Sequence, residues 1–110
     1  MDKEEIINIV ITLAPAQEEE KFNKWYNEVH IPLLLKYRKL KSVTRYKVMG
    51  ESPQSAQYVA IYRFKNKLDF EAFVNGPERA AALKELQETW GHKLKITSVV
   101  PCESIKDWQQ

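Results

Sequence analysis

The order in which strand-like and helix-like segments follow one another is the feature that most restricts the fold of this chain. Runs rich in β-branched and aromatic residues, typical of strands, occupy residues 6–13, 42–49, 57–64 and 94–102. Apolar residues recur at helical spacing over residues 18–30 and 66–90, with a break at residues 75–77. The resulting order is β-α-β-β-α-β. We therefore predict an α+β protein with the ferredoxin-like arrangement, in which two helices cover one face of a four-stranded antiparallel sheet.

Local signals mark where the predicted elements begin and end. Asn66 with Asp69 three residues later resembles a capping box, Pro77 suits a first helical position, and Gly91 suits a helix end. Residues 50–55 form the clearest turn. No linker or repeat interrupts the 110 residues, so we predict that residues 1–110 form one domain.

Both faces of the predicted sheet are partly apolar. Side chains alternate between faces, and neither alternating set is fully polar on the strands at residues 6–13, 57–64 and 94–102. On the last of these, alternation places Val99 on the face opposite Ile96. Two helices cover only one face, so the other needs a cover, and a second copy of the same sheet is the simplest one. We predict a homodimer joined through its sheet faces, a dimeric α/β barrel; the alternative is a monomer with unusually apolar strands.

Charge and composition exclude several classes of partner. A net charge of +2 is too small to favour nucleic acid or an anionic membrane. The six basic residues between Lys36 and Lys47 are interpreted as a solvated helix end and strand edge. The apolar run at residues 6–13 is too short for a membrane span or a signal peptide. Cys102 is the only cysteine, which fits a cytoplasmic location, and we expect it to be a small core residue.

No metal or organic cofactor is predicted. The chain has two histidines far apart, His30 and His92, and neither has an acidic residue at ligand-like spacing. We expect His92, after Trp90 and Gly91, to lie at the surface behind a helix cap. Three glycines form no phosphate-binding loop, and no serine lies in a nucleophile-elbow context.

His30 is the leading candidate for chemistry. Pro32 disfavours helical geometry at the preceding residue, so we expect the helix to kink or end near His30, where the ring can face a cavity. An unperturbed imidazole has a pKa near neutrality and suits general acid or base work. Tyr26 lies one turn earlier on the same helix face. The structural alternative is a helix-end histidine that bonds a free backbone carbonyl.

Aromatic and polar side chains supply the candidate binding residues. Trp25 and Tyr26 are predicted to form an apolar wall of the cavity. Tyr46 or Tyr62 is predicted to direct its hydroxyl into the cavity, because a buried phenol needs a hydrogen-bond partner. Asn8 lies within an apolar strand and needs a partner for the same reason. Such a lining suits a small aromatic ligand. The alternative is that these aromatics are simply core.

The segment between Phe22 and Leu34 resembles a known family. Its pattern Phe-x-x-Trp-Tyr-x-x-x-His-x-Pro-Leu is similar to the first helix of the EthD-like proteins in the dimeric α/β-barrel superfamily. Arg45-Tyr46 and Trp90-Gly91 are weaker matches. The resemblance implies a homodimer with a cavity between sheet and helices, and it places the family's helix-end histidine at His30. It also implies relatives that include cofactor-independent monooxygenases, lactone isomerases, polyketide cyclases and decarboxylases.

Three functions follow as hypotheses. The first is a cofactor-independent enzyme acting on a small aromatic or polyketide-like compound, with His30 moving a proton. The second is a non-catalytic dimeric binding or stress-related protein whose cavity is filled by side chains. The third, a haem-binding protein with His30 or His92 as axial ligand, rests on a lone histidine. An open cavity of several hundred cubic ångströms favours the first, and a packed interior favours the second.

Overall fold

The computed structural model describes residues 5–50 and 55–110. Along the chain the elements are β1 (Ile6–Pro15), η1 (Ala16–Glu18), α1 (Glu19–Trp25), η2 (Tyr26–His30), α2 (Ile31–Leu34), β2 (Leu40–Lys47), β3 (Ser55–Phe64), α3 (Lys67–Val74), α4 (Pro77–Trp90), η3 (Gly91–Lys93) and β4 (Lys95–Glu103). The turn predicted at residues 50–55 lies largely outside the described residues.

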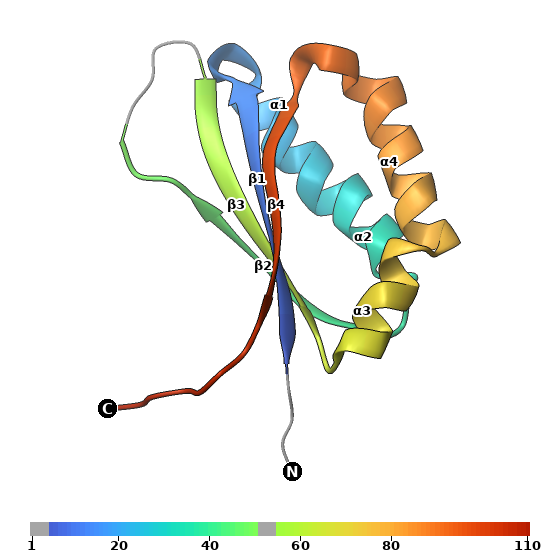
Figure 1. Ribbon diagram of the computed structural model, residues 1–110. Helices are drawn as coiled ribbons and strands as arrows, with labels where there is room; N and C mark the ends of the chain where they lie inside the picture. Colours follow the sequence, from blue (N-terminus) through green and yellow to red (C-terminus); the bar gives the residue numbers. More distant parts are fainter. Residues whose placement is uncertain (1–4, 51–54) are drawn as a thin grey trace.

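The four strands form one antiparallel sheet in the order β2-β3-β1-β4. The helices all lie on one face of this sheet, as Figure 1 shows. The predicted ferredoxin-like α+β fold is therefore confirmed. The observed β2 begins and ends two residues earlier than predicted, and β3 begins two residues earlier. No helix in the described part of the chain is long and apolar enough to cross a membrane.

The hydrophobic core lies between the sheet and the helices. Phe22 on α1 and Phe64 on β3 are both fully buried. Phe22 packs edge-on against Tyr26 and Trp90, with ring centroids 5.5 and 6.1 Å away. Burying an aromatic side chain of this size contributes about 1.5–3 kcal/mol. This packing holds α1 and the end of α4 against the strands and so fixes the position of η2.

The irregularity that Pro32 predicts near His30 is present as a π-helical turn, and the helical run continues past it. α1 continues into η2, a π-helical turn in which the Ile31 N–H donates to the Tyr26 carbonyl, and then into α2. Ile31 keeps helical dihedral angles (φ −61°, ψ −46°) although a proline follows it. A π turn inserts one extra residue and widens the helix. The wider turn accommodates the Pro32 ring, which would clash with the preceding turn of a regular α-helix.

The other local signals for helix ends are confirmed. Asn66 caps α3, since its Oδ1 accepts a hydrogen bond from the Asp69 backbone N–H at 2.8 Å. Pro77 is the first residue of α4, and Gly91 follows its last residue with a positive φ of 59°. These ends depend on residues only a few positions apart, which is why the sequence predicts them.

The sheet face opposite the helices carries no helix (Figure 1), and its side chains are partly apolar. Ile9 on β1 lies opposite Ile61 on β3 and Val100 on β4. This open face contains the side chains of Ile7, Ile9, Ile11, Leu13, Tyr46, Val59, Ile61 and Val100. Val100 and Tyr46 are 45% and 52% exposed. The predicted second apolar face is therefore present.

Strand β4 differs from prediction at two residues. A bulge between its pairings shifts the register, so that Ile11 lies opposite Ser98 while Thr12 lies opposite Ile96. The extra residue places Ile96 on the same face as Val99, and the prediction that these two lie on opposite faces is wrong. Cys102 lies opposite Ile7 on the open face, so it is not part of the core beneath the helices.

Candidate functional site

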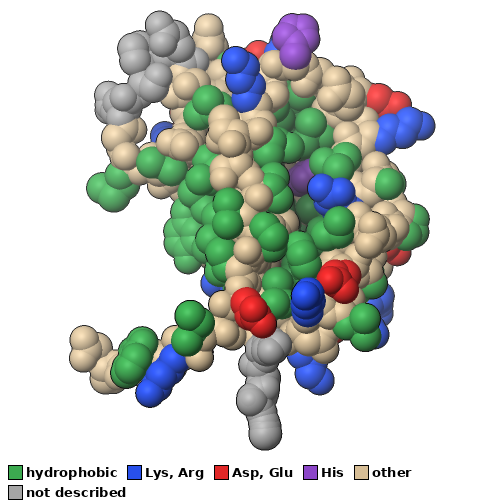
Figure 2. Space-filling view, viewed as in Figure 1, with side chains coloured by type: hydrophobic (Ala, Val, Ile, Leu, Met, Phe, Trp, Pro, Cys, Tyr) green, Lys and Arg blue, Asp and Glu red, His purple; other side chains and the backbone are tan. Residues whose placement is uncertain are grey.

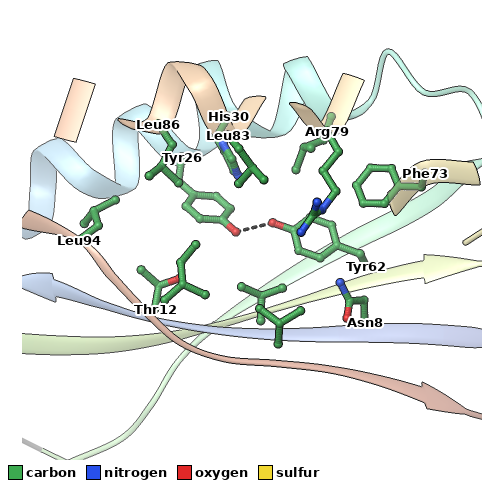
Figure 3. Close-up of a pocket in the computed structure, with 14 residues that line it drawn as sticks. Asn8, Thr12, Tyr26, His30, Tyr62, Phe73, Arg79, Leu83, Leu86 and Leu94 are labelled. Atoms are coloured by element: carbon green, nitrogen blue, oxygen red, sulfur yellow. Dashed lines mark hydrogen bonds between the residues drawn. The ribbon is translucent and has the colours of Figure 1, made fainter. Parts of the chain in front are cut away.

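A small cavity lies between the sheet and the helices. Its floor is the helix-facing side of β1 and β3, and η2 and α4 close it from above (Figure 3). Figure 2 shows a hollow on this side of the molecule, with a histidine inside it and hydrophobic groups around it. The free volume is about 60 Å³. That is room for a few water molecules, since about 10–15 Å³ of such volume holds one.

His30 lies in the wall of this cavity, in the π turn. Its side chain is 5% exposed. The ring stacks on Trp25, with centroids 5.0 Å apart, and packs edge-on against Tyr26 at 4.9 Å. Nδ1 is buried, and neither ring nitrogen has a hydrogen-bond partner among the described residues. The π turn places His30 and Tyr26 together, and the aromatic contacts fix the ring's orientation.

The pKa of His30 in the folded protein differs from that of an unperturbed imidazole. Burial lowers its pKa to about 4, only partly offset by the nearby Glu85 carboxylate, and Arg45 lowers it further. The pKa of His30 therefore lies below the near-neutral value of an unperturbed imidazole, because burial disfavours the charged imidazolium. At neutral pH the ring is an uncharged imidazole, which can accept a proton at one nitrogen and donate one at the other.

Two tyrosine hydroxyls meet inside the cavity. Tyr26 from η2 and Tyr62 from β3 hydrogen-bond to each other through their hydroxyl groups (Figure 3). Both side chains are 4% exposed. Burial raises the pKa of both phenols above the ordinary value of 10. Both hydroxyls therefore keep their protons at neutral pH. One donates to the other, and the second proton is available for an oxygen atom of a ligand.

Arg45 supports Tyr26 from outside the cavity and was not predicted as a site residue. Its guanidinium carbon lies 4.2 Å from the centre of the Tyr26 ring. Its terminal nitrogens donate to Oδ1 of Asn27 at 2.8 Å and to Oδ1 of Asn23 at 2.9 Å. The interpretation of the whole basic stretch as solvated is therefore wrong at Arg45. The alternation of side chains along β2 could have identified Arg45. Neighbouring residues of a strand point to opposite faces, so a Tyr46 on the open face requires Arg45 on the face toward the helices.

The remaining predicted residues lie in different places. Asn8 on β1 lines the cavity, is 5% exposed, and has no partner for its buried Oδ1. Trp25 packs behind His30, where its Nε1 donates to Glu85 at 3.0 Å. Tyr46 does not reach the cavity. It lies opposite Val59 on the open face of the sheet, so the prediction of an inward Tyr46 hydroxyl is wrong.

Helix α4 contributes cavity residues that the sequence interpretation missed. Arg79, Leu83 and Leu86 all line the cavity. Their spacing of four and three residues puts them on one helix face, and this periodicity is the signal that could have found them. Arg79 is the only charged side chain among the described residues that line the cavity.

The described residues include no group of three His, Cys, Asp or Glu side chains placed to hold a metal ion. His92 lies in η3 after the Gly91 cap and is exposed, as predicted. The cavity residues with hydrogen-bonding groups are thus His30, the Tyr26–Tyr62 pair, Asn8, Thr12 and Arg79.

The fold and the cavity place this chain in the class of ferredoxin-like α+β proteins with a cavity between sheet and helices. The chain belongs to the family described as domain of unknown function (DUF4286), whose family model matches residues 5–104. No curated protein matches the chain in sequence.

Several solved structures share the fold at low sequence identity. An EthD family protein from Bacillus halodurans C-125 has a TM-score of 0.66 and 16% identity, covering 91% of this chain and 99% of its own. HapK from Hahella chejuensis has a TM-score of 0.67 and 14% identity, with 96% and 97% covered. SnoaB from Streptomyces nogalater, a cofactor-independent oxygenase, has a TM-score of 0.59 and 14% identity, with 98% and 97% covered. The resemblance expected from the sequence is confirmed in the fold.

Proposed function

We propose that this protein binds a small aromatic or polyketide-like compound at the cavity and transfers a proton through His30 without a metal or organic cofactor. The observation that carries this proposal is the buried, uncharged imidazole of His30 beside the paired hydroxyls of Tyr26 and Tyr62. Buried polar groups in proteins normally have partners. Leaving the buried Nδ1 of His30 unpartnered costs stability, and a ligand that supplies a partner would offset that cost.

The chemistry that this arrangement supports is removal of a proton from carbon next to a carbonyl. The imidazole nitrogen takes the proton, and the electron pair moves onto the carbonyl oxygen to form an enolate. A tyrosine hydroxyl donates a hydrogen bond to that developing oxyanion, which stabilises it in a site with little water. The enolate's negative charge also raises the pKa of the adjacent imidazole, which helps it to hold the proton.

The relatives in structure supply precedent for the fold and for chemistry without a cofactor. SnoaB is a cofactor-independent oxygenase. A protein from an uncultured marine organism, with a TM-score of 0.55 and 15% identity, is a dimeric ferredoxin-like protein. With the apolar open face, this supports a homodimer joined through its sheets as part of the proposal.

Exchange of carbon-bound protons with solvent tests the proposal without knowledge of the natural substrate. Ethyl acetoacetate in D₂O loses its protons between the two carbonyl groups, and proton NMR follows the loss. We expect the protein to accelerate this exchange, and His30→Gln to lose about 10²–10⁴-fold of that acceleration. His92→Gln, the same change at an exposed histidine, is the matched control and should exchange at the wild-type rate. Equal rates for the wild type and His30→Gln would contradict the proposal.

A second candidate function is a non-catalytic, dimeric binding or stress-related protein, and the volume of the cavity favours it. The 60 Å³ present is less than the about 150 Å³ of a cavity that binds benzene. An aromatic ring therefore enters only if side chains at the mouth move. Saturable binding of ethyl acetoacetate, seen as changes in the protein's NMR spectrum, with no acceleration of exchange would support this second function.

A further inference from the structure

Arg79 is a cation without a counter-ion at the cavity. It lies in the first turn of α4 and lines the cavity together with hydrophobic side chains of the same helix. Within residues 5–50 and 55–110 it has no ion pair and no hydrogen bond. A guanidinium stays charged at all relevant pH values and presents five N–H donors in a planar fork. An unpaired guanidinium facing a partly apolar cavity therefore favours an anion in that cavity.

Asn8 supplies a second, independent observation on the other side of the cavity. It is 5% exposed, and its amide nitrogen, the donor end of the side chain, forms no hydrogen bond within the described residues. In Figure 3 its amide nitrogen points toward the helices, while Arg79 extends from α4 toward the strands. The two side chains thus approach the cavity from opposite layers of the fold. Both offer N–H donors, and the Tyr26–Tyr62 pair offers one O–H donor between the layers.

We infer that the ligand of this cavity carries a carboxylate, which binds between Arg79 and Asn8 while its neighbouring carbonyl group reaches the tyrosine pair. This inference rests on the proposed function and names the class of substrate, a small β-keto carboxylate. A single guanidinium balances the single negative charge of a carboxylate and matches its two oxygens in a bidentate pair. A phosphate carries nearly two charges, and no second cation lines the cavity among the described residues.

The size of the cavity agrees with this substrate class. A volume of about 60 Å³ is suited to a carboxylate and the few atoms next to it. The hydrophobic side chains of Leu83 and Leu86 on α4 line the cavity with Arg79 and offer no hydrogen-bonding group that would compete for the anion. Hydrogen bonds to charged groups are stronger where water is excluded. The charge on Arg79 therefore distinguishes a carboxylate from an uncharged compound of equal shape.

Acetoacetate and acetoacetamide test this inference, because they differ in charge and hardly in size. Both are titrated into ¹⁵N-labelled protein, and dissociation constants are taken from the NMR shifts of cavity residues. We expect the wild type to bind acetoacetate about 10–100-fold more tightly, the ratio that corresponds to a charged hydrogen bond. Arg79→Met should abolish this preference. Arg79→Lys should keep part of it. Arg38→Met, the same substitution at an exposed arginine, should keep all of it.

The outcomes separate this inference from the proposed function. If both compounds bind the wild type with equal affinity, or if Arg79→Met keeps the preference for acetoacetate, the carboxylate assignment is overturned and the proposed function stands. If neither compound shifts any cavity resonance of the wild type, both the proposed function and the inference fail. Loss of the preference in Arg79→Met alone supports the inference.

Discussion

At the scale of single residues, the main finding is that His30 is enclosed by aromatic rings and held uncharged. Trp25 and Tyr26 cover the imidazole. The Glu85 carboxylate favours the charged form of His30, but its hydrogen bond is with Trp25. The structure thus places a neutral imidazole beside the hydrogen-bonded hydroxyls of Tyr26 and Tyr62. Its basicity depends on what enters the cavity, because any negative charge there favours protonation.

The lowered pKa of His30 predicts how stability depends on pH. In the unfolded chain the imidazole takes up a proton near pH 6.5, whereas in the folded protein it does so only near pH 4. Between these values the unfolded state binds more protons, so stability is full above pH 6.5 and is lost as the pH falls. The free energy of unfolding should therefore fall by about 2 kcal/mol between pH 7 and pH 5.

Urea unfolding at pH 7 and pH 5 measures this effect. His30→Gln should remove most of the difference between the two pH values, and His92→Gln should keep it. An identical pH dependence in the wild type and in His30→Gln would show that the folded protein does not hold His30 uncharged.

At the scale of elements, the helical run from α1 to α2 is a continuous segment with a π turn at its centre. π turns occur frequently at functional sites, and this one contains Tyr26 and His30 and ends just before Pro32. Its opposite wall, α4, is connected to the sheet through α3. The start of α3 is set by the Asn66 cap, and α3 contributes Phe73 to the cavity lining.

Removing the cap of α3 should destabilise the protein measurably. Asn66→Ala leaves the Asp69 N–H without its acceptor and should cost about 0.5–2 kcal/mol, whereas Asn66→Ser retains a capping oxygen and should cost much less. Urea unfolding at pH 7 compares the two variants. Equal stability of Asn66→Ala and the wild type would mean that the 2.8 Å bond contributes nothing.

At the scale of the whole molecule, the two faces of the sheet have different surroundings. The helices cover one face (Figure 1), and the cavity lies on that side; the other face carries a row of Ile and Val side chains. Extended apolar patches on soluble proteins usually mark interaction sites. The open face is therefore the surface on which the proposed homodimer depends, and it is separate from the proposed site.

A charge at the centre of the open face should dissociate the dimer. Ile9 lies between Ile61 and Val100, so Ile9→Lys would place an unpaired charge within the interface. Light scattering at micromolar concentration should give a dimer mass for the wild type and a monomer mass for Ile9→Lys. Leu68→Lys, on α3 at a residue 74% exposed, should remain dimeric. A monomer mass for the wild type would refute the dimer.

Much of the architecture could be predicted from the sequence because it depends on local signals. Asn66, Pro77 and Gly91 fix helix ends through backbone groups a few residues away. Alternation along β1 and β3 divides the side chains of each strand into two sets, and Asn8 and Tyr62 lie opposite each other within the sets that face the helices. Element order then left the ferredoxin-like topology as the simplest arrangement.

Other features were decided only in the tertiary structure. The bulge in β4 moves Ile96 to the face of Val99, and it arises from pairing with β1 some 85 residues earlier in the chain. Arg45 is partly buried because Asn23 and Asn27 on the first helical run accept its hydrogen bonds. The pKa of His30, the volume of the cavity and the isolation of Arg79 likewise depend on several elements at once. Electrostatic and packing energies are set by distances between residues far apart in sequence, and local patterns do not contain those distances.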